Sequence, residues 1–252
     1  MSKINVDTWE PEGSSTDAIM MASGDTVTVP SGASLVVASG ATINITGATQ
    51  TGFPSAGFDS LVAITSSQSY TIPSDITKQV FYVTGGGGGG GGANVALGSG
   101  SGSAGGTVIK SLSLAAGTAM DIVIGAVAAG GTAGVDGTIG VDTTVTRTGG
   151  TAFTTLTAPG GKPGRYGTSP IASVAPSGGD INIAGGAGGP GGGGGSSYWG
   201  GGGVGAYYST SGSTQSGPGL AHGSGGGSGY STAAYNVASA GAVGIVMIYL
   251  YK

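Results

Sequence analysis

The sequence predicts a mostly β and irregular protein without substantial α-helix, and three observations support this fold class. Glycine makes up 59 of the 252 residues, and 52 of these glycines follow residue 84. Apolar residues alternate with polar ones in short segments, which is the period of a β-strand, and a helical period with capping residues is not found. We expect an N-terminal arm at residues 1–22, a short prism-like stalk of β-repeats at 23–50, a linker at 51–66 and a glycine-rich domain at 67–252.

The stalk is predicted from three eight-residue repeats in residues 23–46, each with Ser-Gly followed by a strand with two apolar positions. Burying an aliphatic side chain stabilises by about 1.5–3 kcal/mol, whereas ordering the backbone costs about 1–2 kcal/mol per residue. Six apolar side chains cannot offset that cost for 24 residues. The repeats therefore favour packing between copies, most economically as a homotrimer. A single-chain β-solenoid packed on the downstream domain is the alternative.

In the glycine-rich domain, short β-strands alternate with glycine tracts. Strands are expected at residues 70–73, 78–84, 107–114, 119–124 and 242–251, and tracts at 85–92, 98–106, 185–195 and 200–205. Such tracts are usually flexible linkers, but here they join strands that must meet, so we expect packed polyglycine-II-like helices bounded by the strands. This helix has three residues per turn and no internal hydrogen bonds, so neighbouring helices must bond to one another. Collagen is excluded because its strict glycine period is broken.

Composition excludes several classes of function. Charged residues are 7 % of the chain and the net charge is −4 without a basic cluster, which argues against nucleic acid as a partner. Cysteine is absent and His222 is the single histidine, so neither a thiolate metal site nor a histidine pair is available. The longest apolar run near the C-terminus, residues 245–251, is too short to span a bilayer. We expect no cofactor, no metal and no membrane insertion.

Catalytic chemistry is not predicted. Asp121, Asp136, Asp142 and Asp180 are the candidates for a carboxylate pair, but solvated turn residues are the favoured interpretation. Gly161-Lys162-Pro163 lacks the Ser or Thr that completes a phosphate loop. We therefore expect that the protein is not an enzyme.

Aromatic residues between the glycine tracts are the strongest candidates for binding. Glycine helices cannot bury rings internally, so rings on their connections must project from an end or edge. Tyr and Trp combine an apolar face with a hydrogen-bonding tip, which suits recognition. The predicted receptor-binding residues are Tyr166, Tyr198, Trp199, Tyr207, Tyr208 and Tyr230. The alternative is that several of these rings serve packing or assembly. His222 is interpreted as a surface-loop residue, with ligand contact as the alternative.

Residues 70–73 and 76–84, running into the first glycine tract, resemble the opening of glycine-rich domains in bacteriophage tail fibres and tail-fibre tip adhesins. Gly105-Gly106-Thr107-Val108 and residues 121–125, 149–153 and 244–248 are similar as well, so the resemblance covers residues 67–252. It implies a virion structural protein that binds a host surface glycan or outer-membrane protein. The arm would attach to other virion proteins, and the chain would be in the tail fibre, with assembly in the host cytoplasm.

Other functions remain open. A purely structural capsid fibre or decoration protein would use the glycine-rich domain as a spacer. A glycine-rich ice-binding protein would need a flat, regular Thr or Ala face, and the irregular aromatic tracts argue against one. A separate tip protein and a short fibre bound directly to the virion are both compatible with the sequence.

Overall fold

The computed structural model describes residues 57–93, 98–148, 153–167, 175–206, 216–229 and 237–252. Over these ranges the chain is β-rich and contains no α-helix, so no helix there could cross a membrane. The mostly β fold class is confirmed. The predicted arm at residues 1–22 and stalk at residues 23–50 lie outside the described residues.

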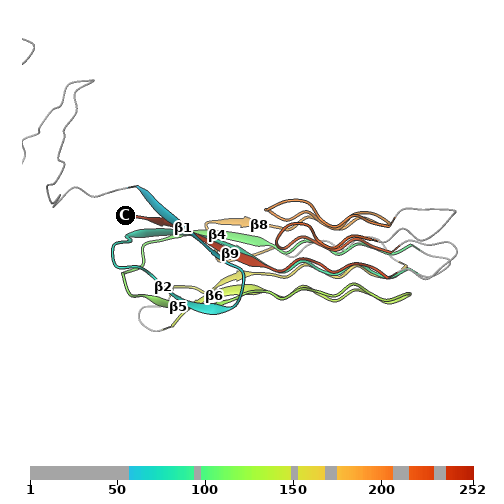
Figure 1. The fold of residues 1–252 in the computed structure, drawn as a ribbon, viewed down its shortest axis with the longest axis horizontal. Helices are drawn as coiled ribbons and strands as arrows, with labels where there is room; N and C mark the ends of the chain where they lie inside the picture. Colours follow the sequence, from blue (N-terminus) through green and yellow to red (C-terminus); the bar gives the residue numbers. More distant parts are fainter. Residues whose placement is uncertain (1–56, 94–97, 149–152, 168–174, 207–215, 230–236) are drawn as a thin grey trace, which may run out of the picture. The chain divides into compact units, whose positions relative to one another are not determined.

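The strands form two antiparallel sheets (Figure 1). One has the order β1-β9-β3-β4-β8, and the other has the order β2-β5-β6-β7. The first contains β1 (Phe58–Ile64), β9 (Ile245–Tyr251), β3 (Lys78–Thr84), β4 (Thr107–Leu112) and β8 (Ile181–Ile183). The second contains β2 (Gln68–Thr71), β5 (Ala119–Val123), β6 (Thr143–Arg147) and β7 (Leu156–Ala158).

All five strands expected from the sequence are present, as β2, β3, β4, β5 and β9. Strands β1, β6, β7 and β8 were not predicted. Strand β1 falls in the segment expected to be a linker, residues 51–66, and it pairs with β9 from Phe58 to Ile64. From Phe58 onward the linker interpretation is therefore wrong, because the backbone of this segment is hydrogen-bonded as an edge strand of the five-stranded sheet.

The two sheets bury one apolar core between them. Phe81, Val83, Val246 and Ile248 come from the five-stranded sheet, and all four are fully buried. Met120, Ile122, Val145 and Leu156 face them from the four-stranded sheet and are buried to the same degree. This core fixes the ends of the strands that lead into the glycine tracts.

The first glycine tract, residues 85–92, continues β3 and bonds to its neighbours with a period of three residues. Its N–H groups donate in three sets to three antiparallel segments, residues 100–106, 135–141 and 239–242. The acceptors are the carbonyls of Gly106, Ser103 and Gly100 for the first set, Val141, Thr138 and Val135 for the second, and Ala242 and Ser239 for the third, at 2.8–3.0 Å. A three-residue turn aims every third amide in one direction, as polyglycine II requires.

Carbonyl groups of the same tract accept hydrogen bonds from three further segments. The donors are the N–H groups of Gly161 and Gly164, of Gly226 and Gly229, and of Gly131. Residues 85–92 are therefore surrounded by six segments, which run side by side away from the sheets in Figure 1. The packed polyglycine-II-like helices expected from the sequence are present.

Close approach of the backbones explains why the inner positions are glycine. A Cβ added to Gly88 would collide with the carbonyl oxygen of Lys162 and crowd that of Gly161. Such contacts are with backbone, so a side-chain rotation cannot relieve them. At Gly189, by contrast, an added Cβ meets nothing within 4 Å.

Gly88→Ala should therefore lower the free energy of unfolding by about 4 kcal/mol or more, because several buried hydrogen bonds at about 1–3 kcal/mol each would be broken. Gly189→Ala is the matched control and should change it by less than about 1 kcal/mol. Urea unfolding followed by circular dichroism measures both. Equal stability of the two variants would contradict close packing around residues 85–92.

Candidate functional site

The six aromatic residues predicted to bind a receptor do not form one cluster. Tyr166, Tyr198 and Trp199 are described, whereas Tyr207, Tyr208 and Tyr230 lie outside the described residues. The Trp199 Nε1–H donates to Thr84 Oγ1 at 2.9 Å, at the start of the central tract. Tyr166 lies at the other end of the tract. There it pairs with Ser99 in an isolated antiparallel β-bridge, and Gly91 N–H donates to Gly100 C=O. Eight residues of polyglycine II separate these two places by about 25 Å.

At the far end of the glycine segments, away from the sheets, backbone hydrogen bonds join several segments to one another. Gly229 N–H donates to Gly91 C=O, Ala206 N–H to Ser228 C=O, and Gly92 N–H to Val135 C=O, at 2.9–3.0 Å. Tyr207 and Tyr208 directly follow Ala206 in the sequence, and Tyr230 directly follows Gly229. The hydrogen bonds thus bring together the residues from which three of the predicted binding tyrosines continue.

Tyr166 itself joins two segments at this far end. Its N–H donates to Asp136 Oδ1 at 2.7 Å, and its side chain is half-buried. Asp136 follows the turn at Gly134, whose φ of 74° is the left-handed conformation that glycine adopts without strain. The described surface at this end is mixed in character, and it includes the exposed residues Val135, Asp136 and Arg165.

Tyr198 and Trp199 belong to a second place, the outer face of the five-stranded sheet. Their rings meet edge to face at 4.9 Å, and both contact Tyr82 of β3, at 5.8 and 6.1 Å between centroids. Tyr82 in turn contacts Tyr249 at 5.2 Å. Burial, followed by the neighbouring tyrosines, raises the pKa of the Tyr82 hydroxyl above its usual value. The sequence could not indicate this contact, because Thr84 and Trp199 are 115 positions apart.

The four candidate carboxylates lie in separate structural contacts. Asp121 accepts from the Ser69 hydroxyl and Asp136 from Tyr166 N–H. Asp142 accepts from Gly160 N–H, and Asp180 pairs with Lys110. These four side chains do not converge on one place, and the described residues hold no group of three His, Cys, Asp or Glu that could bind a metal.

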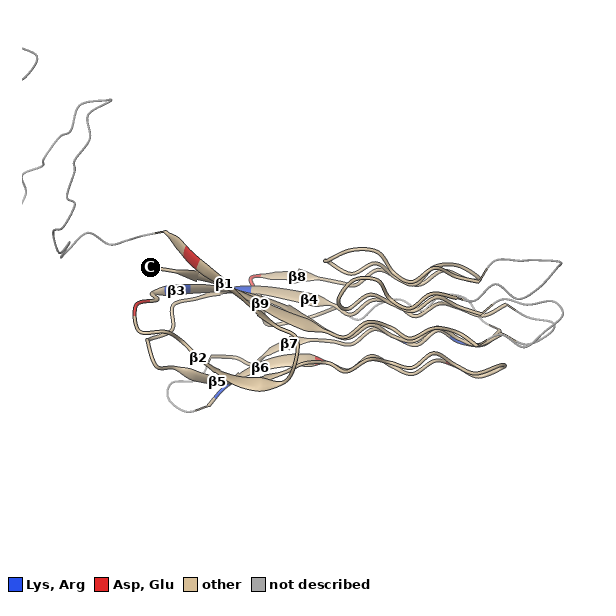
Figure 2. Ribbon diagram, viewed as in Figure 1, with Lys and Arg blue, Asp and Glu red and all other residues tan. Residues whose placement is uncertain are grey.

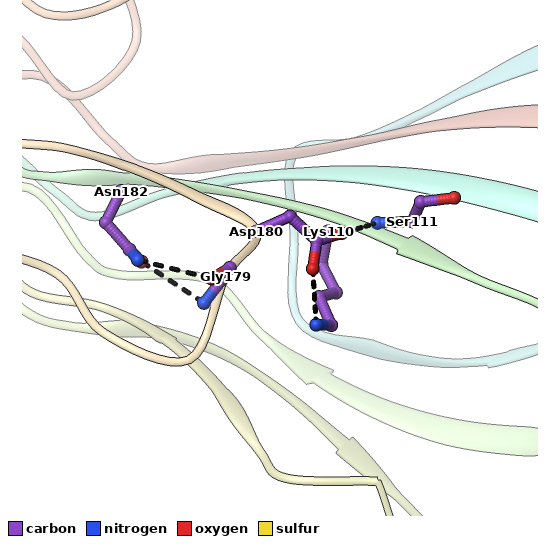
Figure 3. Close-up of polar contacts among 5 residues, drawn as sticks. All are labelled: Lys110, Ser111, Gly179, Asp180 and Asn182. Carbon is purple, nitrogen blue, oxygen red and sulfur yellow. Dashed lines mark hydrogen bonds and ion pairs between the residues drawn. The ribbon is translucent and has the colours of Figure 1, made fainter.

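Asp180 fastens the edge strand β8 to β4 (Figure 3). Its Oδ1 lies 2.5 Å from Lys110 Nζ, and its Oδ2 accepts from Ser111 N–H at 2.9 Å. Gly179 and Asn182 close the adjoining turn through reciprocal hydrogen bonds. The Lys110 ammonium, and then the Ser111 N–H, hold the pKa of the Asp180 carboxyl below its usual value.

Charged side chains lie mostly on or beside the strands, while the glycine segments are almost uncharged (Figure 2). Lys252 Nζ lies 2.7 Å from both Asp59 and Asp75, which ties β9 to β1 and to the loop before β3. Hydrogen bonds from Lys252 lower the pKa of both carboxyls, and the same contacts raise the pKa of Lys252. These ion pairs hold the end of β9 to β1 and to the loop before β3, so their role is structural.

Comparison with known proteins gives one positive finding. A family model described as a glycine-rich domain matches residues 62–251, from within β1 to the end of β9. The match therefore spans both sheets and all the described glycine segments. No curated protein sequence matches the chain significantly.

Trp199→Ala should lower the free energy of unfolding by about 2 kcal/mol, because it removes the ring contacts with Tyr82 and a hydrogen bond to Thr84. Trp199→Phe keeps most of the ring contact and should cost about 1 kcal/mol. Urea unfolding of both variants gives these values. An unchanged midpoint for Trp199→Ala would mean that the ring does not support the scaffold.

The contacts by which Asp180 holds β8 to β4, here called the Asp180 clamp, should weaken in acid. A carboxyl whose pKa is lowered by folding stabilises the fold above the unfolded pKa of about 3.9, and this contribution is lost as the pH falls through the folded pKa. Protection of the Ser111 amide from hydrogen exchange, corrected for intrinsic rates, should decrease over that range. Asp180→Asn should show the lower protection already at neutral pH, whereas Asp121→Asn should leave the Ser111 amide unchanged. Protection independent of pH would refute the clamp.

Proposed function

Because the chain belongs to the family of glycine-rich domains, we propose that it is a virion structural protein, a bacteriophage tail fibre or fibre-tip adhesin. It binds a host cell-surface receptor, a glycan or an outer-membrane protein, through loops of the glycine-rich domain. One observation carries this proposal. A hydrogen-bonded bundle of glycine segments separates the two sheets from a far end, where Gly92, Ala206 and Gly229 are hydrogen-bonded to neighbouring segments.

The bundle suits the presentation of recognition loops. Its stability depends on backbone hydrogen bonds, which do not depend on which side chains follow the last glycine of each segment. Loops on a rigid scaffold can therefore change in sequence while the scaffold keeps its geometry. The low charge of the glycine segments leaves recognition to apolar and hydrogen-bonding groups, and tyrosine supplies both.

The receptor site in this proposal comprises Tyr166 at the far end together with Tyr207, Tyr208 and Tyr230, which directly follow Ala206 and Gly229 in the sequence. Tyr198 and Trp199 are left out of it, because they pack on Tyr82 at the sheet end. The remaining parts of the proposal rest on the sequence. Residues 1–22 attach to other virion proteins, and the repeats in residues 23–46 join three copies. The protein is assembled in the host cytoplasm and acts in the virion.

A purely structural fibre or capsid decoration is the second candidate. The packing of Tyr198 and Trp199 on the sheet favours this structural role, since these two aromatic residues, predicted to bind a receptor, instead contact each other and Thr84. In that case the far end would have no receptor, and the glycine bundle would act as a spacer.

Attachment to host cells distinguishes the two functions. Replacing Tyr207 and Tyr208 together with Ala, or Tyr230 with Ala, should weaken binding of the purified protein to cells about thirtyfold or more, since truncated aromatic hot spots commonly cost 2 kcal/mol or more. Tyr198→Ala is the control, and it should keep attachment because this ring lies at the sheet end. Thermal stability of each variant is measured alongside. Attachment that survives all three far-end substitutions would favour the decoration protein.

A further inference from the structure

The outer faces of the two sheets differ in chemistry. On the four-stranded sheet the outward side chains are nearly all polar, and they include Ser69, Asp121, Thr144, Thr146 and Thr157. This is the usual pattern for an antiparallel sheet with one face in water. The five-stranded sheet breaks the pattern, because each of its strands carries apolar residues on the outer face, beside a few polar ones such as Lys78 and Ser111.

The outer face of the five-stranded sheet, here called the apolar sheet face, carries Phe58, Leu61, Tyr249, Tyr82, Ile109 and Ile181. Cross-strand pairing aligns Leu61 with Tyr249, Tyr82 with Ile109, and Ile109 with Ile181, so the six residues cross all five strands. Phe58, Leu61 and Ile181 are 59 %, 44 % and 55 % exposed. The turn with Tyr198 and Trp199 covers one end of this face, over Tyr82 and Thr84.

The size and composition of this face are those of a protein interface. Strands about 4.8 Å apart with about 3.4 Å per residue give the whole sheet face roughly 500 Å², of which the apolar residues form a part, and exposed apolar patches of a few hundred Å² mark interaction sites. Interface cores are depleted in charge and enriched in aromatic residues. A glycan fits less well, because the rings meet at tilts of 38–89° without forming a flat platform. Leu61, Ile109 and Ile181 also offer sugar hydroxyls no hydrogen-bonding group.

The place where the chain enters the sheet identifies the partner. Strand β1 carries Phe58 and Leu61 of the apolar sheet face, and the chain that precedes it contains the three apolar repeats in residues 23–46. Eleven residues separate the last repeat from Phe58, a reach of at most about 40 Å. Copies joined at the repeats would hold their β1 strands at a high effective concentration. A second copy would therefore meet this face at a higher local concentration than a partner that diffuses freely.

We propose that the apolar sheet face is an interface between copies of this chain, which rests on the proposed self-assembly through the repeats. The face buries its aromatic and aliphatic side chains against the same faces of the other copies in the trimer, and the far end of the glycine segments remains free for recognition.

Site-directed cross-linking tests this interface in the full chain. The sequence contains no cysteine, so each introduced thiol is unique in its copy. Leu61→Cys and Ile181→Cys place thiols on the apolar sheet face. Val123→Cys is the matched control, because Val123 is 48 % exposed on a strand of the other sheet. Leu35→Cys places a thiol in the repeats. Each variant is treated with a short bis-maleimide at micromolar concentration after its fold is checked by circular dichroism.

The expected result is about tenfold more cross-linked dimer for Leu61→Cys and Ile181→Cys than for Val123→Cys, because an interface raises the local thiol concentration. Adding Glu at the other of the two positions, as in Leu61→Cys with Ile181→Glu, should remove the excess. Cross-linking of Leu35→Cys alone would overturn the interface while leaving assembly through the repeats intact. Cross-linking at the sheet face but not at Leu35 would support the interface and overturn the repeat stalk. Equal cross-linking at Leu61, Ile181 and Val123 would also overturn the interface.

Discussion

The structure depends on direct hydrogen bonds between extended glycine backbones. A polyglycine II segment makes no hydrogen bond to itself, so every buried N–H and C=O must be satisfied by a neighbour. In residues 85–92 every N–H group donates to one of three neighbours, and the carbonyls of Gly86 and of residues 88–91 accept from three others. The bonds reach 2.8–3.0 Å only because the inner positions lack a Cβ. Glycine composition is therefore a geometric requirement of the lattice, in spite of the conformational entropy that each glycine loses on folding.

The sheets supply what the glycine segments lack, which is apolar surface to bury and a fixed register. Thr84 pairs with Thr107 at the end of β3 and β4, and the ladder continues without interruption as Gly85 N–H donates to Gly106 C=O. On the other side Thr84 pairs with Ile245 of β9, and Gly87 N–H then donates to Ala242 C=O. Because the core between the sheets sets these starting points, each glycine segment begins in register with its neighbours.

Sequence reasoning predicts those parts of the fold that have a local signal. Strand β3 begins and ends where its alternation of apolar residues does, and the packed helices follow from tracts that are bracketed by strands. Strand β1 was missed because its apolar residues lie on both faces of an edge strand. Strand β8 has three residues, too few for a period. The position of Trp199 depends on a contact with Thr84 far away in the sequence, and the local residues carry no information on that partner.

Side chains return to the chain at positions that face away from the neighbouring glycine backbones. The central segment, residues 85–92, is glycine throughout, and the adjacent residues 98–106 add only serine and alanine. Serine fits there because its hydroxyl replaces a backbone partner, as Ser103 Oγ does for Lys162 N–H at 2.7 Å. Segments on the perimeter carry larger residues that face outward, and Val127 and Val204 are 58 % and 61 % exposed. Chemical variety is thus confined to the perimeter, the far end and the sheet faces, and any function of this domain must be carried by those surfaces.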